Sequence, residues 1–377
     1  MNVRDSEVVE AQLQGQGLQP ASGVEDADVV VINTCSVRDK AEQKLYSDLG
    51  RLKHWKQNGR RVVVAGCVAQ QERDAITKRM PWVDLVLGTH QVRELPKHLE
   101  TVARSGERVI ATEWKHSDPV ARLGRPDTVL PRRRASVFVT IQEGCDNVCT
   151  FCVVPFTRGR EVSRPLDAVV EEVREHVDRG AREIVLLGQN VNSWGAKFDA
   201  FPSFAELLYR VHEVPGVDRI RFTSPHPKDY TEDLATAYRE LPNLCPSAHL
   251  PLQAGSDRVL AAMRRGYTGA RYLEIVAMLR EARPDIHFST DIIVGFPGEL
   301  REDFEATLDI VREVRFAQIY AFVFSPRPMT PALRMDDPVP MADKKAWLQE
   351  LFALQQTIQA EDHQEWVGRS VDVLWTD

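Results

Sequence analysis

Nine short apolar runs, each followed by a stretch with helical spacing, constrain the fold of this chain more than any other feature of its sequence. Nearly continuous apolar runs are typical of parallel strands that are buried on both faces. The alternation of such strands with helices therefore predicts an α/β fold. A chain of 377 residues is too long for one ordinary domain, so we expect two or three.

The first part of the alternation covers residues 1–112 and predicts an open parallel α/β sheet. Its strand candidates are 28–33, 60–66 and 83–88, and its helix candidates are 36–53, 69–79 and 91–104. Residues 113–134 are polar and contain Pro119, Pro126 and Pro131, so we interpret them as a linker,.

The second part covers residues 135–365, where six strand–helix units predict a partial (β/α)6 barrel with ligands at the carboxyl ends of its strands,. The strand candidates are 136–141, 183–188, 219–223, 247–250, 287–296 and 318–324. The helix candidates are 166–179, 203–213, 231–240, 270–282, 301–314 and an amphipathic 341–365. Residues 366–377 open a strand pattern, which we interpret as a small C-terminal β domain that is only begun.

Three of the six cysteines gather in GCDNVCTFC, residues 144–152, directly after a predicted strand. Thiolates of Cys145, Cys149 and Cys152 can bind three irons of a [4Fe–4S] cube, which leaves the fourth iron open to a small molecule. A structural zinc site requires four ligands, and no fourth Cys or His lies nearby in the sequence,. We expect Phe151 to pack against the cluster or its ligand, with an ordinary core position as the alternative.

The spacing of these cysteines, with an aromatic residue before the third, resembles the radical S-adenosylmethionine (SAM) superfamily. The resemblance implies that SAM chelates the open iron and is cleaved to a 5′-deoxyadenosyl radical. Three strand-end segments then resemble SAM contacts, namely LLGQN (186–190), HLPLQAGS (249–256) and DIIVGFPGE (291–299). The residues implied are Gly188, Gln189, Asn190, His249, Gln253, Ser256, Gly295 and Pro297. Each one alone is also compatible with a purely structural role.

Cys35 and Cys67 each follow a predicted strand of the N-terminal sheet. Both should lie at its carboxyl edge, where open α/β sheets bind ligands, although two small buried residues would give the same pattern. The segments NTCSVRDKAEQK, GCVAQQ and FSPRPMTPA resemble the radical SAM methylthiotransferases, most closely the MiaB type. That family implies two [4Fe–4S] clusters, SAM, and methylthiolation of carbon 2 of N6-isopentenyladenosine beside the tRNA anticodon. Relatives modify threonylcarbamoyl-adenosine in tRNA or a ribosomal-protein aspartate.

One departure from the family concerns the second cluster, which takes three cysteines there. The chain begins MNVRDSE, and the family's first cysteine would lie two residues before Met1. We therefore expect the first strand and the first cluster cysteine of the family to be missing, with Cys35 and Cys67 as two ligands. Cys245 could replace the third ligand or be a core residue.

The charge of the chain bears on its partners. The net charge of −7 argues weakly against nucleic acid. Residues 121–134, however, carry five arginines and one Asp, so Arg132, Arg133 and Arg134 are candidates for tRNA phosphate contacts, with a solvated linker as the alternative. A flavodoxin or ferredoxin is the implied electron donor. The N-terminus is neither a signal nor a transit peptide, and no apolar run could span a membrane, so we expect a cytosolic enzyme.

Three other hypotheses remain open on the sequence alone. The first is a radical SAM enzyme that acts on a protein side chain. The second is a cluster-binding scaffold or electron carrier without turnover, although such a scaffold has no need of SAM-binding motifs. The third is a catalytically incomplete fragment, because one cluster cysteine of the family has no counterpart here.

Overall fold

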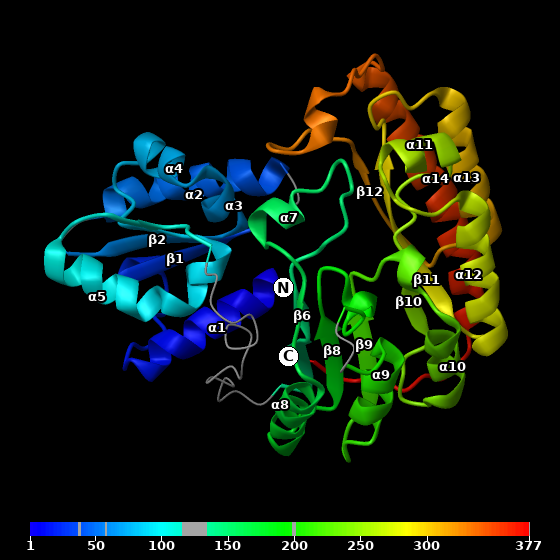
Figure 1. Cartoon of the computed structure of the whole chain (residues 1–377), viewed down its shortest axis with the longest axis horizontal. Helices are drawn as coiled ribbons and strands as arrows, with labels where there is room; N and C mark the ends of the chain where they lie inside the picture. The colour runs from blue at the N-terminus through cyan, green and yellow to red at the C-terminus, as the bar shows by residue number, and fades with distance from the viewer. Residues whose placement is uncertain (37–38, 57–58, 115–133, 198–200, 377) are drawn as a thin grey trace. The chain divides into compact units, whose positions relative to one another are not determined.

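The computed structural model describes residues 1–36, 39–56, 59–114, 134–197 and 201–376 (Figure 1). The chain divides into two compact units. The first comprises residues 1–132, 143–146 and 153–162, and the second comprises 133–142, 147–152 and 163–377. The division at residue 132 falls within the segment interpreted as a linker, of which residues 115–133 lie outside the described part.

The first unit is a parallel sheet in the order β1-β2-β3-β4, covered by helices on both faces (Figure 1). The strands are β1 (Val29–Thr34), β2 (Arg61–Gly66), β3 (Leu85–Leu87) and β4 (Val109–Ala111). The helices are α1 (Asn2–Gly15), α2 (Asp39–Trp55), α3 (Cys67–Glu72), α4 (Asp74–Arg79) and α5 (Leu95–Ser105). Val62 and Val64 pack with residues of α2 and α4, while Val63 and Ala65 pack with α1 and α5. This alternation explains why β2 is apolar throughout.

Several details of the first unit differ from the sequence prediction, among them helix α1, for which no helix was expected. A fourth strand, β4, was missed because three residues are too few to show a period. The helix expected over 69–79 is broken at Arg73, whose positive φ of 52° ends α3 and starts α4. The helix expected from residue 36 begins at Asp39 as α2, and residues 37–38 lie outside the described part.

The second unit contains six parallel strands in chain order, as predicted for a partial (β/α)6 barrel. They are β5 (Ser136–Thr140), β8 (Glu183–Leu187), β9 (Arg219–Thr223), β10 (Ser247–His249), β11 (His287–Val294) and β12 (Gln318–Val323). The first three and the last three form two sheets. A parallel bridge between Ile220 and Leu244 joins them, so the six strands form one series and the predicted α/β fold is confirmed.

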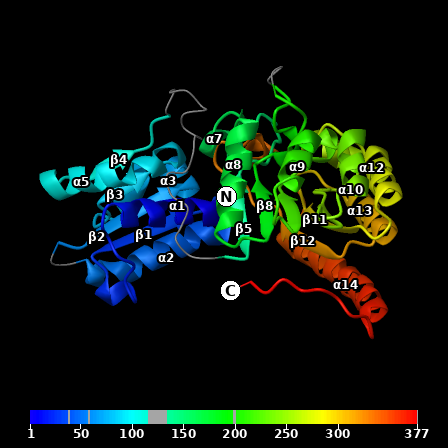
Figure 2. The same ribbon diagram turned by 90° about the horizontal axis from the view of Figure 1, so that it is seen from below.

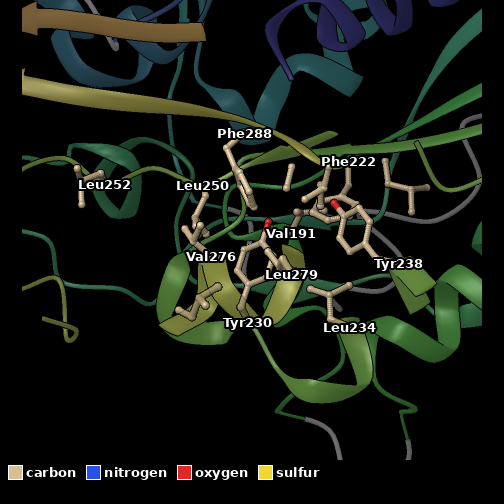
Figure 3. Close-up of a cluster of buried hydrophobic side chains, with 14 of the residues drawn as sticks. Val191, Phe222, Tyr230, Leu234, Tyr238, Leu250, Leu252, Val276, Leu279 and Phe288 are labelled. Carbon is tan, nitrogen blue, oxygen red and sulfur yellow. The ribbon is translucent and has the colours of Figure 1, made fainter. Parts of the chain in front are cut away.

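The helices of the second unit lie along one side of these strands (Figures 1 and 2). They are α8 (Leu166–Asp178), α9 (Phe204–His212), α10 (Glu232–Glu240), α11 (Asp257–Ala262), α12 (Gly269–Ala282), α13 (Arg301–Val314) and α14 (Met341–Trp366). Figure 3 shows part of the core of this unit, where the rings of Phe222 and Tyr238 lie side by side. Phe288 alternates along β11 with half-buried Ser289, which leaves the other face of the strand for polar groups.

Short elements frame the cysteine-rich segment. Strands β6 (Gln142–Glu143) and β7 (Val162–Ser163) pair with each other, and α7 (Val154–Thr157) lies between them in the chain. Residues 367–376, after α14, form no strand, and Arg219 donates a hydrogen bond to the carbonyl of Asp372. The strand pattern expected there is not realised, and the assignment of 366–377 to a further domain stays a prediction. No helix in the described ranges could cross a membrane.

We predict that Glu172→Ala destabilises the second unit by about 3–5 kcal/mol in urea denaturation. The carboxylate lies 2.5 Å from Arg164, and both side chains are at most 2% exposed. Removing it leaves a buried guanidinium without its charge partner. The matched control is Glu171→Gln, whose exposed pair with Arg174 should contribute less than about 1 kcal/mol. Equal effects of the two changes would contradict the prediction.

Candidate functional site

The loop that carries Cys145, Cys149 and Cys152 is held by its own backbone. Cys145 donates its N–H to the carbonyl of Gly159 at 3.1 Å, and Cys152 donates to the carbonyl of Cys149 at 3.1 Å. Thr150 donates its N–H to Met263 at 3.1 Å and its hydroxyl to Ala262 at 2.9 Å. Cys145 is therefore held within the first unit, while the segment with Cys149 and Cys152 is held within the second.

The chemistry of the three thiols fits an iron–sulfur cluster. All three are free of disulfides, with Cys145 and Cys149 buried and Cys152 half-buried. Thiolates are the ligands that hold such clusters in proteins. Within the described ranges, no three His, Cys, Asp or Glu side chains are gathered as a metal site. The assignment of these cysteines as ligands and catalytic centre therefore stays a prediction that rests on donor type and spacing.

The segment after β8 is joined to the segment that precedes the cysteine loop. The buried side chain of Gln142 accepts a hydrogen bond from the backbone N–H of Asn190 at 3.1 Å. A Cβ on Gly188 would lie 2.5 Å from the same Gln142 oxygen, so only glycine fits there. Asn190 donates from its amide to Asp229 at 2.8 Å, while its buried Oδ1 has no hydrogen-bond partner among the described residues. An unsatisfied acceptor at a strand end is suited to a donor group of a ligand such as the SAM amine.

The turn after β11 is built around a buried carboxylate. Gly295 has a φ of 72°, and Glu299 accepts hydrogen bonds from the N–H groups of Gly295 at 2.5 Å and Phe296 at 3.1 Å. A Cβ on Gly295 would collide with the side chain of Lys344, which is itself buried and bonded to Asp337. Burial raises the pKa of Glu299 to about 7, against the opposing effect of the two N–H donors. Strand β11 therefore ends at Val294, two residues earlier than predicted.

The aromatic residue before the third cysteine contacts this turn. Phe151 lies edge-on to Phe296, with ring centroids 6.5 Å apart, and packs against the core of the second unit. Pro297, two residues into the turn, is buried. Both positions are compatible with a wall beside a bound ligand, while their expected roles in SAM binding remain untested.

The loop after β10 does not bring its three polar side chains together. His249 contacts Ser289 at 3.0 Å and Asp291 at 3.2 Å on the half-buried face of β11. Ser256 instead donates to Asp303 at 2.5 Å. Gln253 has a φ of 69°, and its backbone pairs with β11 through Asp291 and Ile293. Ser256 and the backbone of Gln253 therefore have clear structural roles, and only His249 faces the open side of the strands.

Cys35 and Cys67 occupy equivalent positions in the first unit. Thr34 and Gly66 are register partners at the ends of β1 and β2, and each cysteine is the next residue along its strand. Gly66 has a φ of 95°, and a Cβ there would lie 2.5 Å from the Thr34 carbonyl. The Thr34 hydroxyl accepts a hydrogen bond from the N–H of Val68 at 3.1 Å, at the start of α3. Adjacent parallel strands thus deliver both half-buried thiols to one sheet edge.

Three groups beside these thiols were missed in the sequence. Asn33 donates to the carbonyl of Asn2 at 2.8 Å, which ties the start of α1 to the end of β1. Buried Arg158 pairs with Asp5. Although burial opposes its charge, the carboxylate of Asp5 and the thiol of Cys67 raise the pKa of Arg158. Arginine in a turn carries no sequence signal for such a role, since most arginines are exposed.

The remaining candidates lie apart from these sites or outside the description. Cys245 precedes β10 at the amino end of its strand, where its N–H bonds to Ile220 at 3.1 Å. Burial raises the pKa of its thiol, so its place in the structure is that of a core residue. Arg132 and Arg133 lie outside the described residues, and the assignment of Arg134 to phosphate binding is untested.

Comparison with known proteins places the chain in a family. The profile of the Radical SAM superfamily matches residues 139–311, and that of uncharacterized protein family UPF0004 matches residues 1–88. The tRNA-2-methylthio-N(6)-dimethylallyladenosine synthase of Geobacter sulfurreducens is 47% identical over 99% of this chain and 84% of its own length. The synthase of that name from Thermobifida fusca is 46% identical over 99% of this chain and 75% of its own. The chain belongs to the family of these synthases. The resemblance to radical SAM methylthiotransferases is thereby confirmed.

Solved structures agree on the fold. The radical SAM methyltransferase TsrM from Kitasatospora setae, with cobalamin and a [4Fe-4S] cluster bound, aligns with a TM-score of 0.63 at 16% identity. The alignment covers 88% of this chain and 71% of that one. The cobalamin-dependent radical enzyme OxsB aligns with a TM-score of 0.56 at 12% identity, over 94% of this chain and 53% of that one. At these identities the likeness concerns the fold alone. Membership of the synthase family implies a radical SAM enzyme with a [4Fe–4S] cluster and SAM.

We predict that Glu299→Gln changes how the stability of the second unit depends on pH. The pKa of Glu299 in the folded chain, about 7, is above its ordinary value of 4.5. Its stabilising contribution is therefore full below pH 4.5 and is lost as the pH rises through 7, by about 3 kcal/mol. Glutamine can still accept both N–H bonds and does not ionise, so the variant should gain stability relative to the wild type over that window.

The measurement is urea denaturation of both proteins at several pH values between 4.5 and 8. The control is Glu302→Gln, which removes a neighbouring carboxylate at an exposed position. A difference between Glu299→Gln and the wild type that does not vary with pH would show that Glu299 ionises normally.

Proposed function

We propose that this chain adds a methylthio group to carbon 2 of N6-isopentenyladenosine next to the tRNA anticodon. The observation that carries the proposal is identity of 44–47% across 99% of the chain with proteins named tRNA-2-methylthio-N(6)-dimethylallyladenosine synthase. The fold supports it, because six parallel strands send the cysteine loop and the three SAM-like segments to their carboxyl ends. Six relatives of 44–47% identity carry this same name, which does not favour threonylcarbamoyl-adenosine or a protein aspartate.

In this proposal Cys145, Cys149 and Cys152 hold a [4Fe–4S] cluster with one open iron. When bound, the cluster and SAM supply the radical chemistry and the methyl group. The residues of the chain would position the bound SAM. The Oδ1 of Asn190 would accept a hydrogen bond from it, and Glu299 fixes the turn that would face its adenine. Turn and loop together exclude water from a reactive site.

The target base must leave its stack to reach this edge of the strands. Unstacked loop bases are read by hydrogen bonds and by stacking on aromatic rings. The half-buried face of the second unit offers both, because His249 and Asp291 are in contact there and the exposed ring of Tyr320 lies 6.1 Å from His249. These three residues are therefore suited to hold an adenine derivative. Arg132, Arg133 and Arg134 would contact phosphates, which makes binding weaker as salt concentration rises.

A second [4Fe–4S] cluster is proposed at Cys35 and Cys67. The support is their placement one residue beyond paired strand ends, with buried Arg158 beside Cys67. A cluster there would need ligands in addition to these two thiols. Two low-potential centres require an electron donor, for which a flavodoxin or ferredoxin is the proposed class. The proposed compartment is the cytoplasm, which is consistent with a tRNA substrate.

We predict that Cys152→Ala abolishes the modification of tRNA. Loss of one thiolate removes a ligand that the cluster cannot replace from the same loop. The assay is anaerobic incubation with SAM, a reductant and tRNA that carries N6-isopentenyladenosine, followed by nucleoside mass spectrometry. The control is Cys245→Ala, at a core position ahead of β10, which should retain modification. A product on threonylcarbamoyl-adenosine, or none with the wild type, would overturn the proposed substrate.

We predict that Cys35→Ala lowers the iron content of the anaerobically reconstituted chain to about four atoms, the content of the single cube on the Cys145 loop, by removing any iron that Cys35 and Cys67 hold with additional ligands. The signal of the cluster on the Cys145 loop should persist in the electron paramagnetic resonance (EPR) spectrum. Cys67→Ala should behave in the same way. About four irons in the wild type and in both variants would exclude the second cluster and leave the first.

A further inference from the structure

We propose that Arg265 is a positioning residue for the cluster, which donates a charged hydrogen bond to the Cys149 thiolate and so sets the reduction potential. The inference rests on the proposed function in one respect, namely that Cys149 is a cluster ligand. It adds a determinant of the electron-transfer step that lies outside the cysteine motif, 116 residues further along the chain.

The side chain of Arg265 is buried, and each of the three nitrogens of its guanidinium donates a hydrogen bond. Its Nη1 donates to the sulfur of Cys149 at 3.4 Å. Its Nε donates to the hydroxyl of Tyr267 at 3.2 Å, and its Nη2 donates to the carbonyl of Pro251 at 3.3 Å. Only 6% of the residue is exposed. The three bonds fix the planar guanidinium, so the contact with sulfur does not depend on a freely rotating side chain.

The charge of this arginine has no carboxylate partner among the described residues, since no ion pair of Arg265 is found there. A buried cation without a counter-charge is strongly unfavourable. The other two acceptors, a phenol and a carbonyl, are neutral. Burial and the positive charge of Arg265 lower the pKa of His226, which lies against the Tyr267 ring, to about 2, so that neighbour is neutral as well. Cys149 is thus the group in contact with Arg265 that can carry the compensating negative charge.

The backbone around this contact is rigid. Met263, two residues before Arg265, is fully buried and accepts the N–H of Thr150, the residue after Cys149. The hydroxyl of Tyr267 lies 2.9 Å from the carbonyl of Pro251 and 2.7 Å from that of Leu252. The turn that carries Arg265 is therefore tied to the loop that carries Cys149 through Met263, and to the loop after β10 through Tyr267.

The positive charge of Arg265 should affect the reduction potential of the cluster. Hydrogen bonds to the sulfurs and the net charge around a cluster set its reduction potential. Reduction adds one negative charge, so a fixed cation next to a ligand sulfur favours the reduced state and makes the potential less negative. Removal of the cation should therefore make the cluster harder to reduce.

The experiment compares full-length reconstituted chains in a Cys35→Ala, Cys67→Ala background, so that only the Cys145 loop can contribute a cluster signal. We expect Arg265→Gln to make reduction roughly tenfold less favourable, which is about 59 mV for a one-electron couple, in a redox titration followed by EPR. Arg265→Lys keeps the charge and should stay within about twofold of the background protein by the same conversion. The matched control is Arg264→Gln, which removes an exposed charge one residue away and should change nothing.

Two further measurements separate charge from packing. Tyr267→Phe disturbs the same hydrogen-bond network but leaves the charge, so a shift equal to that of Arg265→Gln would overturn the proposal. In protein labelled with 15N-arginine, pulsed EPR of the reduced cluster should detect a nitrogen coupling that disappears in Arg265→Lys. This readout needs no folded Gln variant, and absence of the coupling would also overturn the proposal.

The outcomes distinguish this inference from the proposed function. If the background protein assembles no cluster, the assignment of Cys145, Cys149 and Cys152 fails and the role of Arg265 fails with it. If the cluster forms and its potential is the same in the background protein and in Arg265→Gln, only the role of Arg265 is wrong.

Discussion

Parallel strand pairing is the constraint on which the rest of this structure depends. Strands that run in the same direction end at the same edge, so residues far apart in sequence are brought together without any contact between their side chains. In the first unit, the Thr34–Gly66 register places Cys35 and Cys67 at corresponding positions. In the second unit, the same rule gathers residues 147–152, which carry Cys149 and Cys152, with the segments after β8, β10 and β11. In both units, the parallel order of the strands therefore determines where the cysteines lie.

Strand pairing does not fix the conformation of the segments that follow the strands. Buried polar groups fix these segments through hydrogen bonds. Gln142 joins the end of β8 to the start of the cysteine segment, and Glu299 closes the turn after β11 with two N–H bonds. Gln142 requires a glycine at position 188, because a Cβ there would lie against its side-chain oxygen, while Gly295 is required by its positive φ and by the side chain of Lys344. A buried carboxylate is costly, and the raised pKa of Glu299 is the visible consequence of that cost,.

The sequence was sufficient for nine of the strands and for most helices, because an apolar period is a local signal, while the roles of the cysteines stay predictions from their spacing. Strand 219–223 and helix 301–314 were predicted with their observed bounds. Local sequence patterns do not predict a feature that is determined by a contact with a distant part of the chain. The break at Arg73 depends on a positive φ, and β4 is a strand only because β3 offers it a ladder. Ser256 was expected at the ligand but bonds to Asp303, 47 residues away, a partner that no spacing in its own loop reveals.

Buried arginines beside cysteines were the largest omission, and they distinguish the two cysteine sites. Arg158 in the first unit is beside Cys67 and is paired with Asp5, so the net charge that it brings is small. Arg265 in the second unit contacts Cys149 and has no carboxylate partner in the described chain, so its charge acts on the thiolate in full. If both sites hold clusters of one type, this difference alone makes the Cys149 cluster the easier one to reduce. The protein environment would then direct electrons to the site where SAM is expected to bind, with no difference between the clusters themselves.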